Sequence, residues 1–179
     1  NALPWNDPSI LTAATGIRTM GPAGLPNVQM TSTTRFVVIG GGKSACDAIL
    51  YLRRRLGAPP DDNCARITWV SSTRLAFLKR KVWGGAQSTA DLEGLLKEHD
   101  ASPEAALHEL PSYNKIFHHF TSTPPDTTHL GILSAEEVDE LRQQTRMEGQ
   151  RAISIEKDRI MLTEGELMID GDAVIVTCT

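Results

Sequence analysis

The sequence predicts an α/β fold built on a parallel β-sheet, and three observations lead to this prediction. An apolar run at residues 36–39 ends in three consecutive glycines. An amphipathic helical pattern follows through residue 52, and a second β-rich run lies at residues 66–70. A buried strand that breaks into glycines and continues as a helix is typical of the opening of a βαβ unit.

The spacing of the small residues indicates what this turn binds. Gly40, Gly42 and Ala45 fill the G-x-G-x-x-G/A positions directly after the strand. Gly40 permits the tight turn, Gly42 lets the backbone approach a pyrophosphate, and Ala45 allows close packing of helix on strand. The pyrophosphate-binding residues expected from this pattern are Gly40, Gly41, Gly42, Lys43, Ser44 and Ala45. The alternative is a glycine turn with a purely structural role.

A second phosphate motif overlaps the same residues but fails. Gly42, Lys43 and Ser44 match the end of the P-loop pattern G-x-x-x-x-G-K-[ST]. The first glycine of that pattern would stand at position 37, which is Val37 within the apolar run. The sequence therefore favours a dinucleotide over a nucleoside triphosphate.

The residues after the second β-rich run favour NADP(H) over NAD(H). An acidic residue there would accept hydrogen bonds from the ribose 2′-hydroxyl and would repel a 2′-phosphate. This chain instead has Ser71, Ser72 and Arg74. Arginine pairs well with a phosphate through its planar fork. The alternative for Arg74 is an ordinary solvated surface residue.

Several segments resemble the NADP-binding domain of flavin-containing monooxygenases and related two-dinucleotide flavoproteins. These segments are residues 37–48, 67–74 and 77–80, together with residues 153–165 and 170–179, which are similar to the β-meander and final strand of such domains. The resemblance implies a Rossmann-like NAD(P)-binding domain in an FAD-dependent oxidoreductase, where NADPH reduces the flavin. It also places Thr177 and Thr179 beside the cofactor, at the carboxyl end of the final strand.

The chain departs from the complete family pattern because it carries a single G-x-G-x-x-G/A site. We therefore expect one domain of a larger flavoprotein, with FAD and its binding domain in the missing part. Residues 1–34 are predicted to be an interdomain linker region, and residues 35–179 the NAD(P)-binding domain. The other partner expected is a small-molecule substrate.

Composition excludes several other classes. The chain has 179 residues, 40% hydrophobic and 22% charged, with a net charge of −4, which indicates one globular α/β domain. That charge favours neither nucleic acid nor an anionic membrane. Cys46, Cys64 and Cys178 have neither disulfide-framework nor zinc spacing, which favours a reducing cytoplasm. Cys46 is interpreted as a small packed residue.

The middle of the chain, residues 82–150, is predicted to be a helical insertion. The expected helices are residues 88–99, a second one opened by Ser102 and Pro103, and a third led by a Ser134/Glu137 capping box and extending to Met147. A stripe of apolar residues is expected to form a core face: Leu107, Leu110, Tyr113, Ile116, Phe117 and Phe120.

The function expected from these features is NADPH binding within a monooxygenase-like oxidoreductase, with the chain positioning the cofactor. Two alternatives from other classes stay open at the level of sequence. One is a non-catalytic NADPH-sensing or regulatory module. The other is an interaction domain in which the glycine turn is structural and no nucleotide binds.

Overall fold

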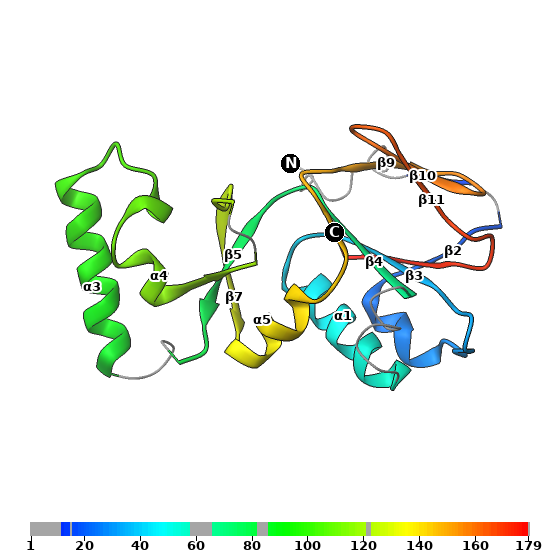
Figure 1. The fold of residues 1–179 in the computed structure, drawn as a ribbon, viewed down its shortest axis with the longest axis horizontal. Coiled ribbons are helices and arrows are strands. Elements are labelled where there is room, and N and C mark those ends of the chain that lie inside the picture. Colours follow the sequence, from blue (N-terminus) through cyan, green and yellow to red (C-terminus); the bar gives the residue numbers. More distant parts are fainter. Residues whose placement is uncertain (1–11, 15, 58–65, 82–85, 121–122, 179) are drawn as a thin grey trace, which may run out of the picture. The chain divides into compact units, whose positions relative to one another are not determined.

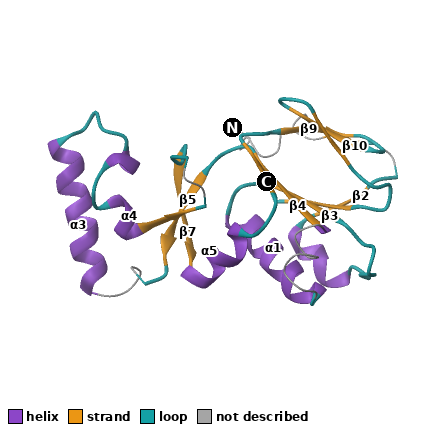
Figure 2. Cartoon of the chain, viewed as in Figure 1, coloured by secondary structure: helices purple, strands orange, loops and turns teal. Residues whose placement is uncertain are grey.

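The computed structural model describes residues 12–14, 16–57, 66–81, 86–120 and 123–178. The chain divides into two compact units: unit 1 comprises Asn1–Thr73 and Gln143–Thr179, and unit 2 comprises Arg74–Arg142. The described residues form two β-sheets in unit 1 and one in unit 2, and each unit has its own helices (Figures 1 and 2). The prediction of a mixed α/β protein with a parallel sheet is confirmed.

Unit 1 is built around a five-stranded sheet in which every described strand pair is parallel. The apolar side chains of the central strands explain this arrangement, because a parallel sheet is covered on both faces and its strands read as continuous hydrophobic runs. All four residues of Phe36–Ile39 are buried. In spatial order the strands are β2 (Arg18–Met20), β12 (Val174–Thr177), β3 (Phe36–Ile39), β4 (Ile67–Ser71) and β8 (Arg146–Glu148).

A second sheet covers one face of the parallel sheet. It contains an antiparallel meander, β9 (Ala152–Ile155), β10 (Arg159–Leu162) and β11 (Glu166–Met168), with β1 (Thr12–Ala13) parallel to β9. The two sheets share one apolar cluster, in which Val37, Ile39 and Ile175 meet Ile155 and Ile160. The meander expected near the end of the chain is therefore present.

Helix α1 (Lys43–Leu56) lies on the opposite side of the parallel sheet from the meander (Figure 1). Side chains alternate between the faces of a strand, so Phe36 and Val38 point away from the meander, toward α1. The helix ends at Gly57, whose φ of 58° is the left-handed conformation common at helix C-termini. A 3₁₀ helix, η2 (Pro22–Asn27), packs beside α1.

Residues 18–20 form strand β2 of the parallel sheet, within the segment expected to be a linker. The predicted domain boundary at residue 34 stays a prediction.

Unit 2 has a three-stranded sheet in the order β6 (Phe117–His119), β5 (Leu75–Lys79), β7 (Thr127–Leu133). Strand β5 is antiparallel to β6 and parallel to β7. Its helices are α3 (Ala86–Ala101), η3 (Leu107–Glu109), α4 (Tyr113–Ile116) and α5 (Ala135–Arg142). The core of unit 2 joins one face of this sheet to Leu95 of α3 and to Tyr113 and Ile116 of α4.

The predicted helical insertion at residues 82–150 is not shown, because this segment contains strands as well as helices. Helix α3 matches the first expected helix, whereas Ser102 begins a turn rather than a helix. The apolar stripe is split: Tyr113 and Ile116 are helical, but Phe117 begins strand β6. Pairing with β5 overrides the helical pattern there, as tertiary contacts commonly override local propensity.

The capping box of the third helix is confirmed in both halves. The Glu137 carboxylate accepts from the Ser134 N–H at 2.7 Å, and the Ser134 hydroxyl accepts from the Glu137 N–H at 3.2 Å. The helix ends at Arg142 rather than at Met147. Met147 instead belongs to β8, which pairs with β4 at the edge of the parallel sheet.

Candidate dinucleotide site at the carboxyl edge of the sheet

The connections of the parallel sheet define where a ligand is expected. From β3 the chain continues to β4 and then to β8 on one side, whereas β12 lies on the other side of β3. The strand order therefore reverses between β3 and β12. In open parallel sheets, ligands bind outside the carboxyl ends of the strands at such a reversal point. Gly40 follows the carboxyl end of β3 at this place.

Only glycine fits at position 40 in this structure. Its φ is +136°, and a Cβ added there would lie 2.7 Å from the carbonyl oxygen of Cys178. Its N–H donates to the carbonyl of Val70 at 2.9 Å, and its own carbonyl accepts from the indole Nε1–H of Trp69 at 2.6 Å. The turn is thus fixed by β4 on one side and by the residue after β12 on the other.

The amino-terminus of α1 directly follows this turn. Gly42 is the N-cap, with extended backbone at φ −78°, and no side chain caps the helix. The first turn also contains no acidic residue. Such a helix start offers N–H groups and the positive end of the helix dipole to an anion. The predicted residues at 40–45 therefore come together as a turn and helix start that fit a pyrophosphate.

The side chains in the first turns of α1 differ in exposure and in partners. Lys43 forms an ion pair with Asp47, one turn further along the helix. Ser44 is exposed, and Ala45 is fully buried against the sheet. Cys46 is buried as well, and burial raises the pKa of its thiol to about 12. This agrees with the interpretation of Cys46 as a packed residue.

A groove of about 280 Å³ lies beside the first two turns of α1. Its wall is mainly apolar, with Leu25 and the prolines of η2 facing Ala48 and Tyr51, while Ser44 and Asp47 add polar groups. Arg55 fastens η2 to the helix by donating to the carbonyls of Leu25, Pro26 and Val28.

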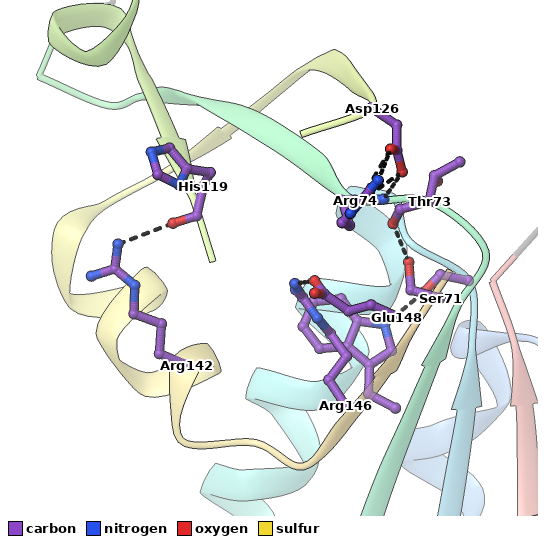
Figure 3. Close-up of polar contacts among 10 residues, drawn as sticks. Ser71, Thr73, Arg74, His119, Asp126, Arg142, Arg146 and Glu148 are labelled. Atoms are coloured by element: carbon purple, nitrogen blue, oxygen red, sulfur yellow. Dashed lines mark hydrogen bonds and ion pairs between the residues drawn. The ribbon is translucent and has the colours of Figure 1, made fainter. Parts of the chain in front are cut away.

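The two predicted serines at the end of β4 differ in their surroundings. Ser71 is 2% exposed, and its hydroxyl donates to the carbonyl of Thr73 at 2.6 Å (Figure 3). Ser72 is exposed. The Ser71 hydroxyl therefore stabilises the local turn, while the Ser72 side chain is open to solvent.

Arg74, predicted to read the 2′-phosphate, is the first residue of unit 2. Its guanidinium holds Asp126, with Nη2 to Oδ1 at 2.5 Å, and its own N–H donates to Oδ2 of the same carboxylate at 2.8 Å (Figure 3). The hydrogen bonds from Arg74 keep the pKa of Asp126 below its ordinary value. Asp126 thus occupies the groups of Arg74 that would pair with a phosphate.

The final strand brings one of its two predicted residues to the site. Thr177 ends β12, and its hydroxyl donates to the carbonyl of Met20 at 3.3 Å. The next residue, Cys178, donates its N–H to the carbonyl of Ile39 at 2.8 Å, which extends the pairing with β3 up to the glycine turn. Thr179 lies outside the described residues.

Sequence reasoning missed a charged group beside the end of β4. Arg146 and Glu148 of β8 form an ion pair (Figure 3). The Arg146 guanidinium lies 4.7 Å from the ring centroid of Trp69. Burial lowers the pKa of Arg146 to about 10. The signal available was the alternation of charged Arg146, apolar Met147 and charged Glu148, which has the period of a strand and was hidden by the helical interpretation.

No protein-family model and no curated protein sequence matches the chain. Within the described residues, no group of three or more His, Cys, Asp or Glu side chains could hold a metal ion. No helix in the described part of the chain combines the length and apolar character needed to cross a membrane.

Proposed function

We propose that the chain is a Rossmann-like, NADP(H)-binding part of an FAD-dependent oxidoreductase of the monooxygenase type. The observation that carries the proposal is the combination of Gly40, held by Val70 and Trp69 and closely approached by Cys178, with an uncapped helix start at the reversal point of the parallel sheet. These features fit the pyrophosphate of a dinucleotide.

The chain's own contribution in this proposal is binding and orientation. The turn at residues 40–45 holds the pyrophosphate through backbone N–H groups and the helix dipole. The end of β12 forms the wall of the crevice on the far side of the turn, and Ser72, which is open to solvent at the end of β4, is proposed to contact the 2′-phosphate. Bound NADPH supplies hydride for a flavin carried by the FAD-binding domain, which is the partner proposed from the family resemblance.

The same proposal includes a small-molecule substrate of the complete enzyme and a cytoplasmic location. The location is inferred from the cysteine spacing in the sequence, which predicts a reducing environment.

The test is a calorimetric titration of the full 179-residue chain with NADP⁺, NAD⁺ and Mg-ATP, repeated on Gly42→Asp. The φ of −78° at Gly42 suits any residue, and aspartate is a favourable N-cap. Its carboxylate would occupy the helix start and repel the phosphates. We expect the variant to keep or gain stability while losing at least about tenfold in NADP⁺ affinity, as loss of a charge-assisted contact predicts.

Gly171→Asp is the matched control, because it adds the same charge at an exposed glycine whose Cβ would meet nothing within 4 Å. It should bind NADP⁺ like the wild type. Equal NADP⁺ affinity in Gly42→Asp and wild type would contradict the proposed site. Absence of dinucleotide binding by the folded wild-type chain would contradict the proposed function.

A further inference from the structure

The Arg146–Glu148 ion pair is an unusual feature of the sheet, because both charges are largely removed from solvent. Their side chains are 11% and 19% exposed. Burying an ion pair is costly, and well-packed apolar residues in its place are often as stable or more so. Packing alone therefore gives no reason for two charges at these positions, which points to a ligand.

The strand register places this pair beside the end of β4. Arg146 is opposite Trp69, and Glu148 is opposite Ser71. The residue that reads the ribose of a dinucleotide is expected at the carboxyl end of this second strand. Adjacent strands are about 4.8 Å apart, so an arginine side chain from β8 reaches across to that position.

The pair also lies on the side of the sheet that carries α1. Met147 packs with the apolar cluster of the meander, so its neighbours Arg146 and Glu148 point to the opposite face. Arg146 therefore lies on the same face of the sheet as α1, whose start is proposed for the pyrophosphate.

We infer that Arg146 binds the 2′-phosphate of NADP(H), and that Glu148 holds its guanidinium when no phosphate is bound. This inference rests on the proposed function. The guanidinium carbon of Arg146 lies over the Trp69 ring, and Nη2 of Arg146 pairs with Glu148. The N–H groups of a guanidinium match a phosphate as well as they match a carboxylate. Unlike Arg74, Arg146 belongs to the unit that contains the glycine turn.

The inference makes opposite predictions for the two partners of the ion pair. In Glu148→Gln the carboxylate no longer competes for Arg146, so NADP⁺ should bind about threefold or more tightly, with NAD⁺ unchanged. In Arg146→Lys the bidentate fork is lost, so NADP⁺ should bind at least about tenfold more weakly while NAD⁺ changes by less than about twofold.

The experiment is calorimetric titration of the full chain with NADP⁺ and NAD⁺ for wild type, these two variants and Arg74→Ala. Because a single substitution leaves one buried charge alone, the double variant Arg146→Met/Glu148→Met is measured too, with urea unfolding to verify its fold. It should bind NAD⁺ like the wild type and show no preference for NADP⁺.

Two results would overturn the inference while leaving the proposed function intact. In the first, the wild type binds NADP⁺, but Arg146→Lys lowers the affinities for NADP⁺ and NAD⁺ equally. This result would indicate a structural role for Arg146. In the second, the preference for NADP⁺ over NAD⁺ is abolished by Arg74→Ala and is unaffected by Arg146→Lys. A folded wild-type chain that binds neither dinucleotide would overturn both the inference and the proposed function.

Discussion

The two units hold their β-sheets together in different ways. In unit 1 the five-stranded sheet is wholly parallel among the described strands, is covered on both faces, and is closed at its carboxyl edge by backbone contacts such as those of Gly40. In unit 2 the sheet is mixed, and the elements around it carry specific side-chain groups: a stacked Tyr113–Phe117 pair, a capping box and the Arg74–Asp126 ion pair. The glycine turn of unit 1 therefore tests backbone fit, and unit 2 tests side-chain chemistry.

The largest expected effect comes from adding a methyl group at the glycine turn. In Gly40→Ala, the strain of a positive φ costs about 1–3 kcal/mol. The new Cβ also meets the Cys178 carbonyl at 2.7 Å. We expect the free energy of unfolding to fall by more than the strain alone, measured by urea denaturation.

Gly165→Ala separates these two contributions. Gly165 has a φ of +87°, but a Cβ there would meet nothing within 4 Å. This control should lose only the strain of the positive φ, about 1–2 kcal/mol. Equal losses for the two variants would show that contact with the final strand contributes nothing.

The second effect concerns the core of unit 2. The Oη of Tyr113 is buried and has no hydrogen-bond partner among the described residues, and burial raises the pKa of this phenol to about 12. Replacing the hydroxyl by hydrogen removes an uncompensated polar group. Tyr113→Phe should therefore raise the free energy of unfolding by about 1 kcal/mol, measured by urea denaturation.

Tyr51→Phe in unit 1 is the matched control, because the Oη of Tyr51 accepts a hydrogen bond from Arg55 at 3.0 Å. This substitution should leave stability unchanged or slightly lower. A destabilised Tyr113→Phe would mean that the hydroxyl has a partner in solution.

The smallest effect is the pH dependence of the Arg74–Asp126 pair, whose side chains are each 37% exposed. Because hydrogen bonds from Arg74 lower the pKa of Asp126 from 3.8, the pair contributes its stability above pH 3.8. That contribution is lost as the pH falls through the folded-state pKa. The stability difference between wild type and Asp126→Asn should be constant from pH 5 to 7 and shrink in more acidic solution, measured by denaturant unfolding at each pH. A difference that does not shrink would contradict this role.

The parts of the fold predictable from sequence are those in which local signals and tertiary contacts agree. Strand β3, the glycine turn and α1 have an apolar run, obligatory glycine geometry and helical periodicity, and all three are present. The Ser134/Glu137 capping box is likewise local, because both of its hydrogen bonds join residues three apart.

The parts that were not predictable depend on distant pairing. Phe117 continues a helical stripe in sequence, yet it pairs with Leu78 as a strand residue. Met147 was expected at a helix end, yet it pairs with Val70. In the candidate site, the place of Arg146 beside the end of β4 follows only from its strand register with Trp69. The ion pair of Arg74 depends on Asp126, which lies 52 residues further along the chain.

The position of β12 has a consequence for how the chain folds. This strand lies between β2 and β3, which come from the opposite end of the sequence, so its pairing with β2 closes the longest loop among the described strands of unit 1. Such non-local pairings slow folding, because chain entropy is lost before the contacts form. During synthesis, the edge of β3 that pairs with β12 stays unpaired until β12 emerges from the ribosome. In that interval, this edge is open to incorrect strand pairing, against which a chaperone would protect the nascent chain.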